Sequence, residues 1–158
     1  MPHDEPRPPP GFEPLFRSSP FLDTVGPFFY RKEPDGGFIL GVRILPKHAN
    51  ARGSAHGGLL LTLIDVALGY RAALSEKPPA PLITASVCAD FVGAPKVGDW
   101  VEAHVDVQKV GGRLAFANAF LVVEGERLVR ASAVFARGAG PLPSSGADTD
   151  TAAGHGRP

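Results

Sequence analysis

One long apolar segment constrains the fold more than any other feature. Residues 57–74 read GGLLLTLIDVALGYRAAL. Large aliphatic residues surround the first turns of this segment, which is typical of a helix enclosed by the rest of the protein. The longest uninterrupted part stops at Asp65, well short of the about 20 apolar residues that cross a bilayer. The segment therefore predicts a buried core helix, with Ser54 as a candidate cap for its start.

Strand candidates lie on both sides of this helix. They are stretches rich in branched and aromatic residues, bounded by Gly, Pro and Asp. The candidates are residues 24–32, 38–45, 82–92, 99–109, 114–123 and 128–137. The last two breaks are short and Gly-containing, as hairpins require. The order β-β-α-β-β-β-β predicts an α+β fold in which an antiparallel sheet wraps one long central helix.

Pro and Gly, which number 17 and 19, are concentrated at the two ends of the chain. Residues 1–14 are rich in Pro, and residues 138–158 hold one large aliphatic residue, Leu142. Neither end buries enough apolar surface to offset the entropy of the chain. We therefore expect disordered tails at residues 1–14 and 138–158 around one domain at residues 15–137.

Charge and cysteine usage exclude several classes of protein. Lys plus Arg and Asp plus Glu are both 16, so the formal net charge is zero. A broad nucleic-acid or membrane-surface role needs a basic field, so neither partner is expected. The single cysteine, Cys88, excludes an intramolecular disulfide and suits a reducing compartment. With no apolar signal region near the N-terminus, the expected location is the cytoplasm.

Asp65 is the residue that fits the core helix least well. On a helix it shares a face with Leu61, Leu68 and Ala72, and no Lys or Arg lies three or four positions away to pair with it. A carboxylate in such a place is costly unless it is paired, hydrogen-bonded or facing a solvated cleft. Two interpretations stay open: a catalytic or ligand-facing carboxylate, or a structural Asp bonded to a neighbouring strand or partner subunit.

The polar segment HANARGSAHGG, residues 48–58, leads into the same helix. Free N–H groups at a helix start attract negative charge, and glycines let a substrate approach the backbone closely. Such an N–H can polarise a thioester or ester carbonyl as an oxyanion hole does, with Asn50 and His56 nearby as hydrogen-bonding groups. The simpler interpretation is a Gly-rich loop with a capping residue.

Other chemistries find less support in the residues. His48, His56 and Asp65 have no zinc-like spacing, the G-x-S-x-G elbow is absent, and Cys88 has no activating partner in the sequence. We expect no metal and no cofactor.

The motif Asn50-x-x-Gly53-x-x-His56-Gly57-Gly58, followed by Asp65, resembles the hotdog-fold thioesterases of the phenylacetate-degradation (PaaI) type. Later segments of the chain also resemble that family, over a total span of residues 20–137. These segments are residues 83–91 with the turn 94–99, the hairpin region 108–113, and the final strand around 129–133.

The resemblance implies a long helix wrapped by an antiparallel sheet, homodimers with a continuous sheet, and often homotetramers. It implies hydrolysis of acyl-coenzyme A thioesters at active sites that draw residues from both subunits. Asp65 would be the general base or nucleophile, and the Gly57 N–H would polarise the thioester carbonyl. Asn50 would orient water or substrate, His56 would support the carbonyl side, and Thr84 would assist the water.

Thr84 poses a problem of strand parity. It alternates with the polar Ser86, Cys88 and Asp90, while the apolar positions lie between them. Either the site lies at the end of the strand or a bulge re-aims Thr84.

Because the net charge is zero, a few basic residues must hold the anionic coenzyme A. Gly111 and Gly112 next to Arg113 are favoured, since exposed N–H groups and a guanidinium together suit phosphate. The expected coenzyme A contacts are Gly111, Gly112, Arg113, Lys96 and Arg130, with Lys109 and Arg137 as further basic candidates. The candidates for an acyl pocket are aromatic, although aromatics in a small domain are usually core: Phe21, Phe28, Phe29, Tyr30 and Tyr70.

Two rival functions share this fold. One is a hotdog module that binds acyl-CoA without catalysis, which has no need of a carboxylate in its helix. The other is a hotdog dehydratase or hydratase acting on thioester-bound acyl chains.

Overall fold

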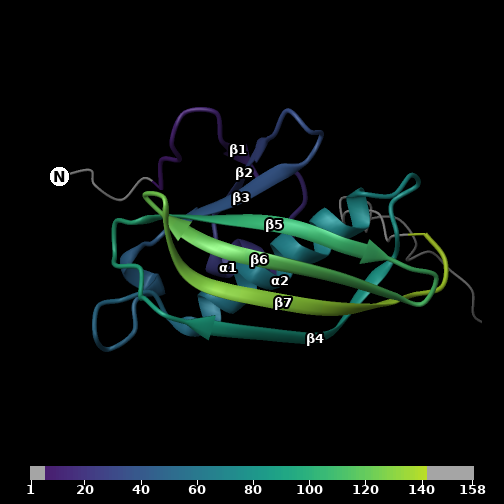
Figure 1. The fold of residues 1–158 in the computed structure, drawn as a ribbon. Helices are drawn as coiled ribbons and strands as arrows, with labels where there is room; N and C mark the ends of the chain where they lie inside the picture. The colour runs from purple at the N-terminus through teal and green to yellow at the C-terminus, as the bar shows by residue number, and fades with distance from the viewer. Residues whose placement is uncertain (1–5, 142–158) are drawn as a thin grey trace, which may run out of the picture.

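A computed structural model describes residues 6–141, and in it one long helix lies across one face of a seven-stranded antiparallel sheet (Figure 1). The elements are β1 (Glu13–Pro14), α1 (Pro20–Val25), β2 (Phe28–Lys32), β3 (Phe38–Arg43), a 3-10 turn (Pro46–His48), α2 (Gly57–Leu74), β4 (Leu82–Phe91), β5 (Trp100–Val110), β6 (Leu114–Val123) and β7 (Glu126–Arg137). The strand order is β1-β2-β3-β5-β6-β7-β4. The predicted α+β architecture is confirmed.

Most of α2 packs against the sheet. Its buried residues are Leu59, Leu60, Leu63, Ile64, Ala67, Leu68, Ala72 and Ala73. By length and composition alone, with a mean hydropathy of 1.4, this helix could also cross a membrane, but the sheet already accounts for its apolar character. The prediction of burial on all sides is wrong for a single chain. Leu61 is 38% exposed, and Asp65, one turn later, is half-buried.

The first predicted strand begins four residues too early. Residues 24–25 belong to α1, and β2 starts at Phe28. Ser19 caps α1 by accepting a hydrogen bond from the Leu22 N–H, and Pro20 stands in the first turn, where its missing N–H costs nothing. Leu22 then anchors the helix in the core.

The expectation that residues 1–14 form a disordered tail is wrong for the described part of that segment. Phe12 is buried and packs edge-on against Trp100, with ring centroids 4.8 Å apart. Glu13 and Pro14 pair with β2, and the Arg43 guanidinium donates to the Arg7 carbonyl. One aromatic residue therefore attaches a Pro-rich segment to the sheet. Residues 1–5 and 142–158, which include most of the predicted C-terminal tail, lie outside the described residues.

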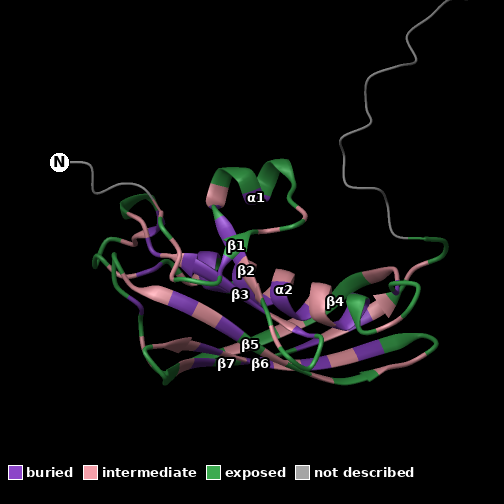
Figure 2. Ribbon diagram, turned by 90° about the horizontal axis from the view of Figure 1, so that it is seen from above, coloured by how far each residue is buried: buried purple, intermediate pink, exposed green. Residues whose placement is uncertain are grey.

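Strand β4 forms an edge of the sheet. It follows α2 in the chain but pairs with β7, while β5 crosses to pair with β3. Figure 2 shows most of its residues as exposed. Ile83 and Phe91 are 64% and 45% exposed, and Val92 just beyond the strand is 80% exposed. One chain therefore leaves an apolar strand edge uncovered beside the open side of α2.

Candidate active site

Asp65 and Thr84 lie together where α2 faces β4. The Thr84 hydroxyl donates to Asp65 Oδ1 at 2.7 Å. The pairing register of β4 with β7 shifts between Thr84 and Ser86, and this bulge pairs Thr84 with the buried Phe135. Of the two alternatives for Thr84, the structure has the bulge, which turns its side chain toward the helix.

The Asp65 carboxylate is held at one oxygen only. Within residues 6–141 it forms no ion pair, and its Oδ2 accepts no hydrogen bond. The structural interpretation, an Asp bonded to a neighbouring strand, is therefore met by Thr84. The second oxygen, on the open side of α2, is the one that could act in catalysis. That side of the helix is uncovered in one chain, so Asp65 is only half-buried.

His56, rather than Ser54, caps the start of α2. Its Nδ1 accepts a hydrogen bond from the Gly58 N–H at 3.0 Å. A neutral His56 therefore carries its proton on Nε2, and the side chain is exposed. The ring presents an N–H donor to solvent immediately before the helix.

The Gly57 N–H is open to a ligand. Gly57 is the first residue of α2, where N–H groups have no intrahelical acceptor, and no acceptor for it is found among residues 6–141. A Cβ added at Gly57 would meet only the Phe91 ring, at 3.9 Å. Phe91 thus forms one wall beside this N–H. The inward parity of Phe91 at the end of its strand signals this, but the sequence analysis did not assign it a role.

Asn50 builds the turn that precedes the helix. Its Oδ1 accepts from the Arg52 N–H at 2.8 Å and from the Ser54 N–H at 3.3 Å. Gly53, with φ of +76°, completes the turn in a region that favours glycine. The carbonyl of the Asn50 side chain is therefore used by the backbone, and its amide remains as a donor.

The two groups of predicted residues are separated within one chain. Gly57 and Asp65 are eight positions apart on α2, which corresponds to about 12 Å along the helix axis. A carbonyl carbon under attack needs both its base and its oxyanion donor within about 3–3.5 Å of the reacting atoms. One chain alone therefore does not bring Asp65 and the Gly57 N–H onto the same thioester.

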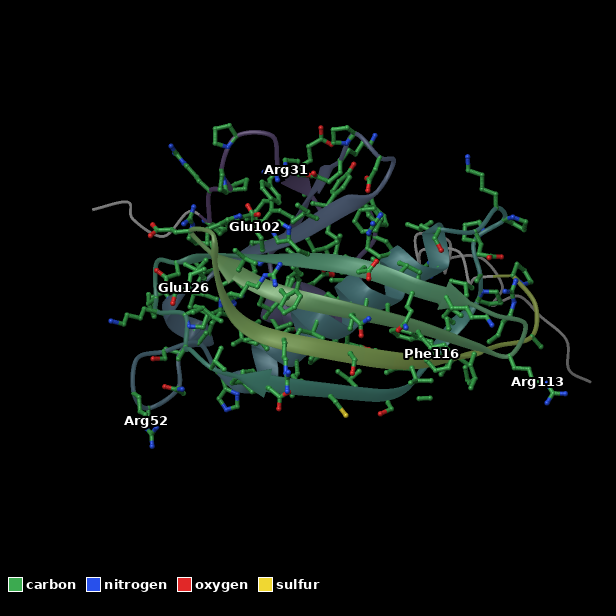
Figure 3. All side chains as sticks on the ribbon, in the orientation of Figure 1. Arg31, Arg52, Glu102, Arg113, Phe116 and Glu126 are labelled. Carbon is green, nitrogen blue, oxygen red and sulfur yellow. The ribbon has the colours of Figure 1, made fainter. Side chains whose placement is uncertain are left out.

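The predicted coenzyme A contacts are also divided between two ends. Lys96 lies next to the loop before α2, since it forms a bridge with Ser54. Gly111, Gly112 and Arg113 follow β5, whose 11 residues span about 33 Å. Figure 3 shows Arg113 at the opposite end of the molecule from Arg52, an exposed residue in the turn before α2. Arg52 is a further basic residue near the start of α2 that was not among the predicted contacts, although it stands inside the Asn50–Gly53 motif.

Two of these predicted contacts already have protein partners. The Gly111 N–H donates to the Leu114 carbonyl at 2.8 Å, so only the Gly112 side of that turn is open. Arg130 forms an ion pair of 2.8 Å with Asp90. It alternates with the buried Val129, which puts its side chain on the sheet face away from α2.

The five aromatic candidates for an acyl pocket do not line one cavity. Phe28 lies in the main core, whereas Phe29 packs with Phe12 in a separate cluster. Tyr30 and Tyr70 both pack around Phe16, and burial raises the pKa of Tyr70. These four residues serve mainly in packing, whereas Phe21 is 60% exposed.

Comparisons with known proteins agree with this fold and motif. The thioesterase superfamily profile matches residues 52–130. A Pseudomonas aeruginosa esterase candidate, PA0474, is 54% identical over 128 residues, covering 80% of this chain and 95% of that protein. Mouse acyl-coenzyme A thioesterase 13 is 28% identical over 80 residues, covering 51% of this chain and 56% of the mouse protein.

A solved structure supports the architecture. The PaaI protein of the Escherichia coli phenylacetic acid degradation operon superposes with a TM-score of 0.71 at 17% identity, covering 80% of this chain and 89% of that one. At this identity the likeness concerns the fold, which is the hotdog fold expected from the motif. The matched profile begins inside the Asn50–His56 loop and includes Gly57, Asp65 and Thr84. The chain belongs to the thioesterase superfamily.

Proposed function

We propose that this protein hydrolyses acyl-coenzyme A thioesters to a free acid and coenzyme A. The observation that carries the proposal is Asp65, an ionisable carboxylate in the middle of an apolar core helix. It has one oxygen held by Thr84 at 2.7 Å and its other oxygen unpartnered within residues 6–141. This second oxygen lies on the open side of α2, where a water molecule can reach it and give up a proton to it.

Each active site combines two chains. Within one chain, Gly57 and Asp65 are about 12 Å apart along α2. In a dimer, Asp65 of one copy can instead face Gly57 of the second copy. The uncovered edge of β4 and the exposed Leu61 support such a pairing. Pairing of β4 with its own copy around a two-fold axis extends the sheet and reverses the ends of the second chain. The far-end turn at Gly112 and Arg113 of one copy is then carried toward the Gly57 end of the other.

The chemistry follows from the two halves. Asp65 removes a proton from water while the water oxygen attacks the thioester carbonyl carbon. The Gly57 N–H, assisted by the Nε2–H of a neutral His56, stabilises the negative charge that forms on the carbonyl oxygen. Collapse of this intermediate breaks the C–S bond, and the thiolate of coenzyme A leaves and is protonated. Direct attack by Asp65 gives an acyl–Asp anhydride that water then hydrolyses, with the same overall balance.

Lys96 and Arg52 supply positive charge near the start of α2, where the phosphates of coenzyme A would lie. Both are exposed, and neither forms an ion pair within residues 6–141. Phe91, beside Gly57, offers an apolar wall for the part of the substrate next to the thioester.

The test is turnover by the purified protein of acyl-CoAs with aliphatic chains of increasing length and with aryl groups. The wild-type protein should release free thiol, and Asp65→Asn should reduce kcat by about 10²–10⁴-fold, the usual contribution of a general base. An unchanged melting temperature confirms that the variant is folded, because Asn keeps the oxygen that accepts from Thr84.

Two results would contradict the proposed activity, and a third would contradict the role of Asp65. Tight acyl-CoA binding without turnover by the wild-type protein would favour the binding module. Water addition to an enoyl thioester with no thiol release would favour the hydratase. Near-wild-type hydrolysis by a folded Asp65→Asn variant would remove Asp65 from the mechanism.

A further inference from the structure

His48 is a buried histidine that the proposed chemistry does not use. It lies in the 3-10 turn Pro46–His48, between β3 and the loop that leads to α2, and it is 5% exposed. It is the one polar or charged residue in the described core that is buried. A histidine there is costly unless its ring nitrogens do something for the surrounding backbone.

The ring of His48 closes the start of this loop. Its Nδ1 accepts a hydrogen bond from the Leu45 N–H at 3.0 Å. An acceptor at Nδ1 requires a neutral ring with its proton on Nε2. That Nε2 is buried and has no hydrogen-bond partner among the described residues.

The backbone of His48 reaches the catalytic end of the same loop. Its carbonyl accepts from the His56 N–H at 2.8 Å. His56 is the cap of α2, and the next amide is the open N–H of Gly57. Ala49 and Ala55 form a bridge between these two contacts. The orientation of the Gly57 N–H therefore depends on a series of hydrogen bonds that starts at the His48 ring.

Burial lowers the pKa of His48, and the charge of Lys47 acts in the same direction. The backbone carbonyls of Val25 and Gly26, at the end of α1, and of Arg43, at the end of β3, oppose this shift. Lys47 is the charged side chain that acts on the ring among residues 6–141, while α1 and β3 present carbonyls. The neutral ring that the Leu45 contact requires is thus the form present at neutral pH.

We infer that His48, in its neutral Nε2-protonated form, is a positioning residue that orients the Gly57 N–H through the Leu45–His56 loop. The inference rests on the proposed function for its catalytic consequence, since a correctly aimed oxyanion donor acts on kcat. Protonation of His48 puts an N–H at Nδ1 opposite the Leu45 N–H, so two donors face each other. The loop then loses the contact that closes it.

Two variants separate the hydrogen-bond acceptor of the His48 ring from its ability to gain a proton. His48→Asn places an oxygen near the position of Nδ1 and keeps an acceptor that does not titrate. His48→Leu keeps apolar volume and removes the acceptor. At pH 7.5, His48→Leu should lower kcat about 10-fold or more with KM changed less than about 2-fold, and His48→Asn should recover most of that loss.

The dependence of kcat on pH distinguishes this role from a merely structural one, which would leave that dependence unchanged. In the wild type, kcat should fall on the acid side of about 6.5, the ordinary pKa of histidine, as His48 gains its proton. His48→Asn should lack the part of this limb that His48 contributes. Equal kcat for His48→Leu and wild type, or the same acid limb in His48→Asn, would overturn the inference while leaving the thioesterase proposal standing.

A measurement without substrate covers the case in which no acyl-CoA is hydrolysed. Hydrogen exchange of the amides at residues 48–58 should be about 10-fold faster in His48→Leu than in the wild type, with the amides of β6 unchanged. A nitrogen–proton correlation spectrum should show the His48 proton on Nε2 at neutral pH. Unchanged exchange in the loop, or a proton on Nδ1, would contradict the assigned role.

Discussion

Thr84 determines which way the Asp65 carboxylate points. Its hydroxyl holds Oδ1 at 2.7 Å, so the side chain is fixed in one direction by a hydrogen bond from the neighbouring strand. A charged acceptor strengthens such a bond. Thr84 is thus a positioning residue for the carboxylate, whatever contact it also makes with water.

Thr84→Ala is expected to lower kcat about 10-fold. A hydrogen bond to a charged group contributes about 1.5–3 kcal/mol, and without it the Asp65 carboxylate is no longer held in one orientation. Thr84→Ser keeps the hydroxyl and should retain most of the activity. The matched control is Ser86→Ala, two positions on and paired with Val134 on the outer face. Equal rates for Thr84→Ala and wild type would contradict the role.

At the residue scale, residue types and spacing predicted several residues of the candidate site. The isolated carboxylate, the Gly pair at the helix start and the awkward parity of Thr84 all pointed to the residues that the structure brings to α2. Residue types and spacing did not show that a polar side chain in the loop would bond to the backbone of its own turn. Asn50 reads as a ligand-facing amide in sequence, but its oxygen serves the turn through Arg52 and Ser54.

Among the elements, β3 and β5 pair along four residues, and one side chain of β5 approaches the β3 backbone very closely. The Trp100 ring at the start of β5 lies directly over Gly41 in β3, so that an added Cβ would overlap the ring. The ring is also packed by Phe12 and Phe29 and covered by the Arg43 guanidinium. This contact attaches the N-terminal segment to the sheet.

Gly41→Ala should therefore destabilise the fold by about 1–3 kcal/mol, the usual cost of overpacking a filled site, and lower the melting temperature. Gly112→Ala is the matched control, since a Cβ there meets nothing within 4 Å. Thermal unfolding followed by circular dichroism measures both. Equal melting temperatures for Gly41→Ala and wild type would show that Trp100 is free to move aside.

The elements that the sequence predicted best were those with a long, regular pattern. The helix at 57–74 and the strand at 114–123 match the structure residue for residue. The short elements were missed because their signals are local. The start of α1 is indicated by two residues alone, Ser19 and Pro20. The two-residue strand β1 depends on the tertiary contacts of Phe12.

For the molecule as a whole, the open side of α2 and the edge of β4 form one uncovered apolar surface. It includes Leu61 and Phe91, which are 38% and 45% exposed, and Asp65 lies one turn after Leu61 on α2. Ile83 pairs with Ala136 and lies on the opposite face of the sheet. An exposed strand edge of this kind pairs readily with another chain. A second copy on this surface would bury Asp65 further than one chain does.

Spacing along a helix says which residues share a face but not which copy completes the site, so only the resemblance to the family implied a site shared between chains. In the proposed mechanism Gly57 and Asp65 act on the same thioester, but they stand about 12 Å apart on the same helix. The central claim is therefore that each site takes Asp65 from one chain and Gly57 from another.

Mixing two inactive variants tests this claim directly. Asp65→Asn removes the base. Gly57→Pro removes the N–H at the first helical position, where Pro is tolerated, and His56 at φ −64° and ψ 134° already has the backbone that precedes a proline. Gly57→Ala keeps the N–H and should stay active, since a Cβ there meets only Phe91, at 3.9 Å.

Each variant alone should be inactive, and the two should be unfolded together, refolded as a mixture and assayed for acyl-CoA hydrolysis. In a mixed dimer, one site combines an intact Asp65 with an intact Gly57, so random pairing should restore about one quarter of the wild-type turnover. Sites built within single chains contain a defect in every copy. No recovery in a mixture shown by mass to contain the mixed dimer would contradict the shared site.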